Sequence, residues 1–517
     1  MLKFMSFRFR NFLLGVSTTV AVALGMEACQ QSQPAQSDNF DTFYSLDGDT
    51  LGITTVVDSL QVPWEIAVGP AGDLWYTEQY GAVSRIDLTT GRRKELLRLN
   101  DTFVLRTSGL LGMVLYPDMD VHPYVFLAYT SEEGEQRRSR IMRYTYDVQR
   151  DTLVDPLCIQ EFGAWTSHFG ARLQIAPDGK LMVTSGDGAQ DGFAQDTGKV
   201  LGKILRFNLD GTVPDDNPIA GSPVWAWGLR NSQGLTYGAN GLLYGSEHGD
   251  AVEDEVNLIQ KGQNYGWPVV EGYIDTDPER AFARDVAVTE PLKAWTPTVA
   301  PAALVAYRGS QIPAFKQSLL LATLKGNALR LLKLNDDGQQ IVNDRALFYQ
   351  LFGRIRALCV AENGDVYFGT SNKDWNPNGT PKLNDDRIIR IRKVGPLEVA
   401  GRPVLPAIVT DDDSRGTVDS AKVLFTNYCA ACHQADGKGV PNVFPDLTAS
   451  ALVHQQAADS LITVVLSGRA EMPAFHFLKD DELATILTYI KQELADQPDA
   501  VRAADLHRLR ATVATAP

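Results

Sequence analysis

A short pattern that recurs between about residues 50 and 395 limits the folds available to this chain. Each copy consists of an apolar segment, a turn containing Gly or Pro, and an alternating strand that ends in Thr, Ser or Gly. Asp-Gly and Asn-Gly turns between alternating strands are strong signals of β-hairpins. Four copies begin at Ile66, Gln174, Leu235 and Val360, and a longer variant begins at Leu115.

These unevenly spaced hairpins favour a β-propeller over a β-sandwich, because no helical periodicity separates them. A blade takes about 40–50 residues, so the segment has room for about six. We therefore predict a mainly β fold, a six-bladed β-propeller over residues 46–395. Two motifs in the first blades, Val62-Pro-Trp-Glu65 and Gly109-Leu-Leu-Gly-Met113, are interpreted as structural turns.

Polar residues gather at predicted strand ends between Trp165 and Pro268. His168 lies at a loop–strand junction, and an imidazole is suited to accept a proton near neutral pH. Asp187 ends a strand and could orient that base. The neighbouring Arg230-Asn231 pair suits a planar, acidic ligand. The alternative is that the His is structural, that the Asp belongs to a turn and that the Arg-Asn pair caps a turn. The density of polar residues at strand ends favours an active-site face.

Three further cations follow or open predicted strands: Lys325, Arg354 and Arg356. The i, i+2 spacing of the two arginines directs both to the same side of one strand. Two adjacent cations repel each other unless they are solvated or face an anion. The sequence therefore leaves two possibilities, a solvated strand edge or an anion-binding site.

The formal net charge of −15 argues against a nucleic-acid binder and offers no patch for an anionic membrane surface. The length of 517 residues predicts two or more domains. Of five cysteines, Cys158 and Cys359 lie among apolar neighbours, so we expect buried thiols rather than a disulfide.

The N-terminus has the pattern of a signal peptide, with basic residues, an uncharged run from Asn11 to Met26, and Ala28-Cys29. The run is too short for a comfortable membrane span. Cys29 after a small residue resembles a bacterial lipoprotein signal, with plain secretion as the alternative. We predict a signal peptide over 1–29, a polar tether over 30–45, and an exported protein in the periplasm or outer membrane, lipid-anchored through Cys29.

The C-terminal part carries the covalent c-type haem signature Cys429-Ala-Ala-Cys432-His433. Both cysteines would hold the haem, and His433 would be the proximal iron ligand. Met472 is the predicted second ligand, and His454 and His476 are rival candidates. A thioether ligand favours Fe(II) and raises the potential, as an electron relay requires.

Helical spacing of apolar residues from Leu483 to Leu494 predicts a closing helix in this part. We therefore predict a linker over 396–417, a small all-α domain over 418–497 that resembles a class I-type monohaem cytochrome c, and a C-terminal tail over 498–517.

The region from about Val62 to Arg392 resembles the pyrroloquinoline quinone (PQQ)-dependent glucose/sorbosone dehydrogenase family, whose fold is a six-bladed propeller. The motifs are specific in combination. They are His168-Phe-Gly-Ala-Arg-Leu, Thr184-Ser-Gly-Asp187, Gly228-Leu-Arg-Asn-Ser-Gln-Gly-Leu, Ser246-Glu-His-Gly, Asp254-Glu-Val-Asn-Leu-Ile, Asn264-Tyr-Gly-Trp-Pro and Trp295-Thr-Pro-Thr-Val-Ala-Pro301.

The resemblance implies a role for each matching residue. His168 looks like the general base for a substrate hydroxyl, Asp187 would support it, and Arg230 would contact the quinone. Asn231, Lys325, Arg354 and Arg356 would hold PQQ with its three carboxylates. Backbone carbonyls of Gly249 and Asp250 would help bind a Ca²⁺ beside the quinone, and Glu255, Tyr265 and Asp275 match a structural Ca²⁺ site.

Three positions depart from the family pattern. Asp250 stands where Pro is often found, and Leu229 stands where His is common. Thr107-Ser108 replace a Gln-Asn pair of the glucose-oxidising soluble members, which leaves the sugar preference open.

The resemblance predicts an exported quinohaemoprotein dehydrogenase that oxidises an aldose sugar to a lactone. Electrons would pass from PQQ through the c-type haem to an external acceptor, a redox protein or respiratory chain. One alternative is a non-catalytic propeller that binds a ligand and carries a cytochrome c, since fold does not fix function. The other is oxidation of a non-sugar alcohol or a sorbosone-like aldehyde.

Overall fold

The computed structural model describes residues 39–513, with internal gaps at 135, 166, 191, 375–380, 407–408, 412–419, 435, 441–443, 470–471, 473 and 477. The predicted signal peptide and the predicted lipidation site at Cys29 lie outside the described residues. No helix in the described ranges is long and apolar enough to cross a membrane.

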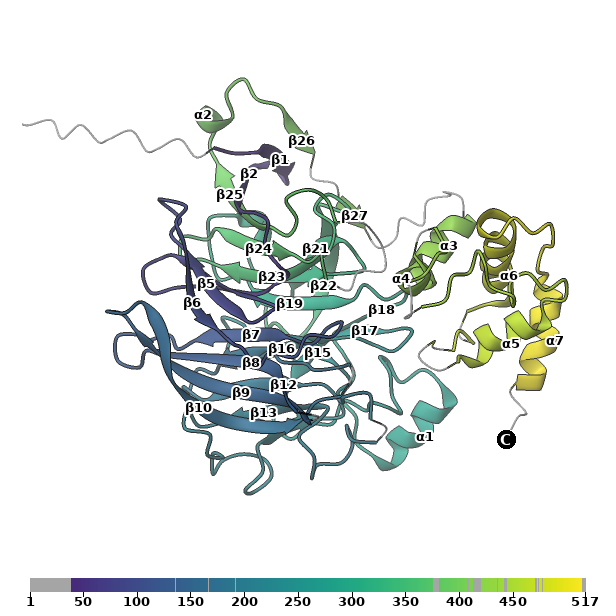
Figure 1. Ribbon diagram of the computed structural model, residues 1–517, viewed down its shortest axis with the longest axis horizontal. Helices are drawn as coiled ribbons and strands as arrows, with labels where there is room; N and C mark the ends of the chain where they lie inside the picture. Colours follow the sequence, from purple (N-terminus) through teal and green to yellow (C-terminus); the bar gives the residue numbers. More distant parts are fainter. Residues whose placement is uncertain are drawn as a thin grey trace, which may run out of the picture. The chain divides into compact units, whose positions relative to one another are not determined.

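The strands of the described residues form six sheets, which confirms the predicted six-bladed propeller (Figure 1). Neighbouring strands within a blade are antiparallel and follow chain order. The first blade contains β3 (Pro63–Val68), β4 (Leu74–Glu78), β5 (Ala82–Ile86) and β6 (Arg93–Arg98). The second contains β7 (Leu110–Leu115), β8 (Tyr124–Glu133), β9 (Gln136–Asp147) and β10 (Thr152–Gly163). The third contains β11 (Leu173–Ile175), β12 (Leu181–Ser185), β13 (Lys203–Phe207) and β14 (Val224–Trp227).

The remaining blades follow the same plan. The fourth contains β15 (Ser232–Tyr237), β16 (Leu243–Glu247), β17 (Asp254–Ile259) and β18 (Lys293–Trp295), with helix α1 (Asp277–Asp285) inserted before β18. The fifth contains β19 (Pro301–Ala306), β20 (Ser318–Thr323), β21 (Ala328–Leu334) and β22 (Ile341–Leu347), with the short helix η1 (Pro313–Phe315) before β20. The sixth contains β23 (Ile355–Val360), β24 (Val366–Thr370) and β25 (Ile388–Val394).

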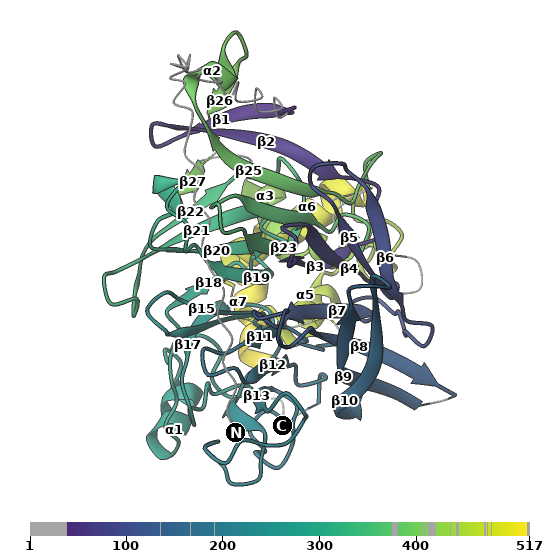
Figure 2. The same cartoon turned by 90° about the vertical axis from the view of Figure 1, so that its left-hand side faces the viewer.

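The N-terminal strand β2 (Asp49–Val57) completes the sixth blade by pairing antiparallel with β25. Figure 2 shows these purple and green strands side by side, with β1 (Thr42–Leu46) next to β2. The first strand of each blade contacts the first strand of the next, and the contact between β23 and β3 closes the ring. The ring therefore closes through residues from both ends of the propeller sequence.

The inner hairpins form where the repeated pattern predicts them. In the third blade, Ala176 N donates to Lys180 O around Gly179, whose φ of +78° suits a residue without a Cβ. Strands β12 and β13 are buried along their whole length, as expected for strands packed between neighbouring blades.

The cysteines at 158 and 359 are free thiols, as predicted, but their burial differs from the prediction. Cys359 is partly buried, whereas Cys158 is exposed. Cys158 lies on β10 beside buried Ile159, so alternation along the last strand of the blade turns the thiol outward.

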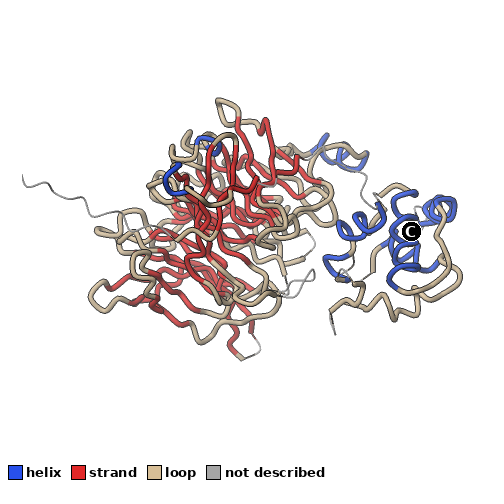
Figure 3. Tube along the Cα trace, turned by 90° about the horizontal axis from the view of Figure 1, so that it is seen from above, coloured by secondary structure: helices blue, strands red, loops and turns tan. Residues whose placement is uncertain are grey.

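The C-terminal region is helical, and Figure 3 separates its blue helices from the red strands. Its apolar core includes Phe425, Ile462, Leu487 and Leu506. The helices are α3 (Ser420–Tyr428), α4 (Ala430–His433), α5 (Asp459–Ser467), α6 (Asp480–Tyr489), the π-helical turn η2 (Ile490–Leu494) and α7 (Ala503–Val513).

Three predicted boundary segments contain more structure than their composition indicates. Strand β1 lies partly inside the predicted tether. The predicted linker contains helix α2 (Pro396–Val399), β26 (Val404–Pro406), which pairs with β1, and β27 (Val409–Asp411), which pairs with β22. The predicted tail contains α7, which packs on α5 and α6. Strands of only three residues at the edge of a blade are too short to show the alternation of apolar and polar residues by which a strand is recognised in sequence.

Candidate active site

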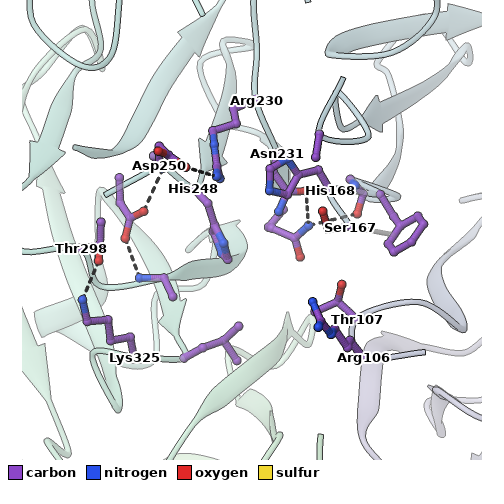
Figure 4. A pocket seen from close by; sticks show the side chains of 18 of the residues that line it. Arg106, Thr107, Ser167, His168, Arg230, Asn231, His248, Asp250, Thr298 and Lys325 are labelled. Atoms are coloured by element: carbon purple, nitrogen blue, oxygen red, sulfur yellow. Dashed lines mark hydrogen bonds and ion pairs between the residues drawn. The ribbon is translucent and has the colours of Figure 1, made fainter. Parts of the chain in front are cut away.

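A cavity of about 710 Å³ collects the polar residues predicted at the strand ends (Figure 4). Most of these residues precede the first strand of a blade or follow its second strand, and Arg356 is the second residue of β23. Antiparallel pairing brings these positions to the same end of each blade. Its lining includes His168, Asp187, Arg230, Asn231, Gly249, Asp250, Lys325, Arg354 and Arg356. Cys432, Phe444 and Met472 border it as well.

His168 and Asp187 form a hydrogen-bonded pair in this cavity. His168 Nδ1 lies 2.6 Å from Asp187 Oδ1, and the His168 side chain is 18% exposed. A proton on Nδ1 satisfies this bond and leaves Nε2 as the free acceptor. Burial lowers the pKa of His168, although Asp187 acts in the opposite direction. The imidazole is therefore neutral at neutral pH and can take up a proton.

Asp187 is held in place by two further donors. Ala189 N and Trp267 Nε1 each donate to its carboxylate over 2.8 Å. Burial alone would raise the pKa of Asp187, but the hydrogen bond and charge of His168, with these donors, lower it. The carboxylate stays ionised and fixes the tautomer and ring orientation of His168.

Two glycines allow the two loops to approach each other. A Cβ on Gly186 would lie 1.9 Å from His168 O, and one on Gly170 would lie 2.7–2.9 Å from backbone atoms of residues 184–186. Gly170 also has a φ of +64°. The glycines beside His168 and Asp187 in sequence are thus required by backbone contact.

A second histidine in the cavity is less suited to act as a base. His248 Nε2 lies 2.8 Å from Pro301 O and donates to it. Burial, followed by the nearby charge of Arg230, lowers the pKa of His248 to about 3. No carboxylate orients its ring among the described residues, so we assign the base to His168.

Arg230 lies between an acid and an aromatic ring. Its Nη2 donates to Asp250 Oδ1 over 2.6 Å, and its guanidinium lies 5.2 Å from the centre of the Trp267 ring. Its Nε is buried and has no hydrogen-bond partner in the described part of the chain. Leaving a buried cationic donor without a partner is costly, and a bound anionic or carbonyl group would satisfy it.

Asn231 and Lys325 reach the cavity from different blades. Asn231 Oδ1 accepts bonds from Gly170 N over 3.2 Å and from Gln233 Nε2 over 3.0 Å, which directs its amide nitrogen away from both. Lys325 Nζ donates to Thr298 Oγ1 over 2.7 Å, and burial lowers the pKa of Lys325. Both retain donor capacity for a ligand.

Arg354 and Arg356 are buried, so they do not form a solvated strand edge. Both guanidinium groups contact the carboxylate of Asp374, which explains how two adjacent cations are tolerated. The i, i+2 spacing predicts that Arg354 and Arg356 point to the same side of the strand, and their shared contact with Asp374 agrees with this.

Gly249 and Asp250 form a tight loop after β16. A Cβ on Gly249 would lie 1.8 Å from Val252 O, and Gly249 N donates to Asp254 Oδ1 over 3.0 Å. The buried Asp254 carboxylate also accepts bonds from Val299 N and Ala300 N over 2.5 and 2.6 Å. The loop backbone is therefore held rigidly, as carbonyl ligands to a hard cation require.

The predicted structural calcium residues belong to the same blade, Glu255 on β17 and the other two in the connection from β17 to β18. Glu255 is buried and accepts bonds from Asn257 and Gly272, and Asp275 is exposed. The Tyr265 hydroxyl bonds to Leu258 O and Gln260 N within the protein. No group of three or more His, Cys, Asp or Glu side chains in the described residues is arranged to hold a metal. The structural calcium site stays a prediction.

Glu253, which the sequence did not single out, lies among these acids. Burial, followed by the charges of Asp275 and Glu255, raises the pKa of Glu253 to about 8. Burial likewise raises the pKa of Glu255 and of Glu271 to about 7. Such carboxyls resist ionisation without a compensating cation.

We expect the thermal stability of the EDTA-treated protein to fall between about pH 5 and pH 8. Each raised carboxyl keeps its proton when folded at a pH where the unfolded chain, with an ordinary pKa of 4.5, has lost it. The unfolded state binds fewer protons across this window, so the free energy of unfolding decreases as pH rises. The Tm measured with and without Ca²⁺ at both pH values checks this.

Added Ca²⁺ should raise the Tm more near pH 8 than near pH 5. The Glu253→Gln variant should show a weaker pH dependence, because it removes one of the titrating groups. Equal effects of Ca²⁺ at both pH values would contradict the predicted Ca²⁺ binding near Glu255.

The predicted haem ligands lie in the helical domain. His433 is buried, and its Nδ1 lies 3.0 Å from Pro445 O, to which it donates. This bond fixes the tautomer and leaves Nε2 free for iron, as is usual for a metal-binding histidine. Cys432 and Met472 both border the cavity described above, and Met472 as the second iron ligand stays a prediction. The rival His454 donates from Nε2 to Thr448 O over 2.8 Å and is exposed.

Several site residues were missed from sequence. Trp267 belongs to a family motif that predicts no role for it, and no sequence pattern singles out Asp374. The two motifs interpreted as structural turns lie instead at the start of β3 and β7, where Trp64 and Leu111 line the cavity. The uncharged residues Trp64, Leu111 and Trp267 give no chemical signal in sequence, and their position in the cavity depends on closure of the ring.

Comparison with known proteins agrees with this two-part organisation. Residues 60–376 match the family model described as glucose/sorbosone dehydrogenase. Residues 416–490 match the model described as cytochrome c oxidase, cbb3-type, subunit III. Over 93 residues the chain is 33% identical to cytochrome c-552 of Thermus thermophilus, a match that covers 15% of this chain and 70% of that protein.

The propeller has characterised relatives. The chain is 28% identical over 428 residues to quinoprotein glucose dehydrogenase B of Acinetobacter calcoaceticus, covering 65% of this chain and 86% of that one. The PQQ-bound aldose sugar dehydrogenase of Streptomyces coelicolor has a similar structure, with a TM-score of 0.58, 30% identity, and coverage of 66% of this chain and 98% of that one. These similarities confirm the predicted propeller and cytochrome c domain.

Proposed function

Because this chain belongs to the glucose/sorbosone dehydrogenase family, we propose that it is an exported quinohaemoprotein dehydrogenase for aldose sugars. It oxidises the C1 hydroxyl to a lactone with PQQ and passes the electrons through a c-type haem to an external acceptor. The observation that carries this proposal is the His168–Asp187 pair in a cavity that residues of the haem-binding motif also border.

The reaction requires a base and a hydride acceptor. His168 Nε2 takes the proton of the C1 hydroxyl, and the imidazolium that forms is stabilised by the ionised Asp187 carboxylate. Trp267 holds that carboxylate through Nε1 and so keeps the imidazole aligned. PQQ bound in this cavity would supply the acceptor for the hydride of C1, with Ca²⁺ as the Lewis acid beside it.

The residues around the cavity fit this cofactor. PQQ carries three carboxylates, and the cavity presents Lys325, Arg354 and Arg356 together with the unpartnered Nε of Arg230 within the described residues. Arg230 stabilises negative charge that develops on the cofactor carbonyl. The rigid Gly249-Asp250 backbone suits a Ca²⁺ ion there. A carbohydrate-binding module does not need this excess of cations.

Oxidation of the sugar releases two electrons together, whereas a haem carries one electron at a time. Met472 as an axial ligand would raise the haem potential and so favour acceptance of electrons by the haem. The acceptor beyond it is a redox protein or a respiratory chain. The signal sequence supports export to the periplasm or outer membrane, with Cys29 as a lipid anchor.

The test is the absorbance of the haem-loaded protein during addition of an aldose, with PQQ and Ca²⁺ present or omitted. We expect the reduced-haem band to grow only when sugar, PQQ and Ca²⁺ are all present. Reduction of an artificial dye without haem reduction would retain the dehydrogenase and remove the internal relay. Absence of both across a panel of sugars and alcohols would overturn the proposed function.

A further inference from the structure

The two arginines at the start of the sixth blade are held by one turn in the same manner. Arg354 Nε donates to Ser371 O over 3.2 Å, and its Nη2 lies 3.2 Å from Asp374 Oδ1. Arg356 Nε likewise donates to Ser371 Oγ over 2.9 Å, and its Nη2 donates to Asp374 Oδ2 over 2.5 Å. Each guanidinium therefore uses its Nε and Nη2 on this turn, and Nη1 of each makes no hydrogen bond within the described residues.

The turn and the arginines form one buried unit. The side chain of Asp374 is 4% exposed, and those of Arg354 and Arg356 are 10% and 5% exposed. Ser371 Oγ also donates to Asp374 Oδ2 over 2.6 Å. Burial alone would raise the pKa of Asp374, but the two arginines outweigh it and lower the pKa. The unit holds two cations and one anion, so a net positive charge remains.

A second acid keeps the turn itself in place. Asp386 accepts hydrogen bonds from Asn372 N over 2.5 Å and from Lys373 N over 3.1 Å. Asn372 Oδ1 in turn accepts from Arg354 N over 2.9 Å. The backbone that carries Asp374 is thus fixed by hydrogen bonds. Ordering an arginine side chain costs rotamer entropy, and here the two side chains are ordered before any ligand binds.

We propose that Asp374, assisted by Ser371, is a positioning residue that fixes Arg354 and Arg356 as a preformed receptor for a carboxylate of PQQ. Asp374 neutralises one of the two charges and occupies the Nε–Nη2 edges, so the carboxylate meets the two Nη1 donors. This inference rests on the proposed function, because it concerns the cofactor of that same cavity. Preorganised donors bind more tightly because less ordering remains to be done on binding.

The experiment measures binding of PQQ to the full-length, Ca²⁺-saturated protein prepared without PQQ. Trp64 and Trp267 line the cavity, so quenching of tryptophan fluorescence reports occupancy. We expect Asp374→Asn to weaken PQQ binding by about 10- to 100-fold, the range found when a residue that orients a metal ligand is lost, because Asp374 orients the two arginines in the same way. Ser371→Ala removes the hydroxyl that bonds to both Arg356 and Asp374 but leaves the ion pairs in place, so it should weaken binding by roughly 3- to 10-fold.

The trimethyl ester of PQQ separates positioning from general loss of structure. The ester lacks the carboxylates, so Asp374→Asn should change its affinity by less than about threefold, whereas general damage weakens both ligands equally. The matched control is Asp344→Asn, which breaks a similarly buried pair with Arg330 away from the cavity. It should leave PQQ affinity unchanged even if it lowers the Tm.

Each outcome decides the proposal. Equal or tighter PQQ binding by Asp374→Asn, or an equal loss for PQQ and its ester, overturns the positioning role alone. If the wild-type protein does not bind PQQ, the proposed function fails and this role fails with it. Selective loss of PQQ affinity in Asp374→Asn, with Asp344→Asn unaffected, supports the role.

Discussion

Replacement of His168 by alanine is expected to reduce sugar oxidation by about 10²- to 10⁴-fold, the usual contribution of a general base. The loss follows because the alanine leaves no acceptor beside the cavity for the hydroxyl proton. Sugar-driven haem reduction should disappear, whereas haem loading should be unaffected. Steady-state rates with a dye acceptor and the haem spectrum measure both.

The backbone at His168 decides which second variant to use. Its φ of +56° lies in the left-handed region, where asparagine is tolerated better than alanine. His168→Asn therefore preserves the loop but is no base, and it should lose activity to a similar degree. The control is His122→Ala, an exposed histidine in the second blade. Unchanged turnover in both His168 variants would remove this residue from the mechanism.

A pH profile tests how Asp187 acts. Its hydrogen bond and charge raise the pKa of His168 against the opposing effect of burial. In Asp187→Asn this support is lost, so the imidazole loses its proton at a lower pH. The acidic limb of kcat/KM should therefore move to lower pH while the maximum rate falls, because the ring is no longer aligned. A lower rate with an unmoved limb would indicate only structural damage.

The propeller could be predicted because five inner hairpins carry their own turn signals. The inner hairpin of the fifth blade has no such turn signal, because η1 (Pro313–Phe315) occupies the connection between β19 and β20 in place of an Asp-Gly or Asn-Gly turn. The sixth blade needs β2, which lies more than three hundred residues from β25 in sequence. The number of blades thus depended on length and resemblance, and only the paired strands confirm it.

The site was predictable where chemistry lies close together in the chain. His168 and Asp187 are 19 residues apart and lie at the ends of adjacent strands. Trp267 reaches Asp187 across 80 residues, and Asp374 meets the arginines through a turn whose geometry depends on Asp386. The family resemblance implies only a backbone role for Asp250, yet its side chain pairs with Arg230. Contacts formed by ring closure leave no local pattern in sequence.

Replacement of Met472 by alanine is expected to stop internal electron transfer while leaving sugar oxidation intact. The haem stays attached through Cys429 and Cys432, but the iron loses the thioether that favours Fe(II). The midpoint potential should fall by on the order of 0.1 V or more, within the ~0.8 V range over which axial ligands set haem potentials. A redox titration of the haem measures the shift.

Two activities separate the relay from the dehydrogenase in this variant. Dye reduction that bypasses the haem should match that of the wild type, because Met472 contributes nothing to the His168–Asp187 pair. Haem reduction by sugar should be lost. The matched controls are His454→Ala and His476→Ala, which replace the rival ligands and should leave the potential unchanged. A shifted midpoint potential in either control, with an unchanged potential in Met472→Ala, would identify that histidine as the distal ligand. The haem would then have a lower potential than thioether ligation provides, because imidazole stabilises Fe(II) less.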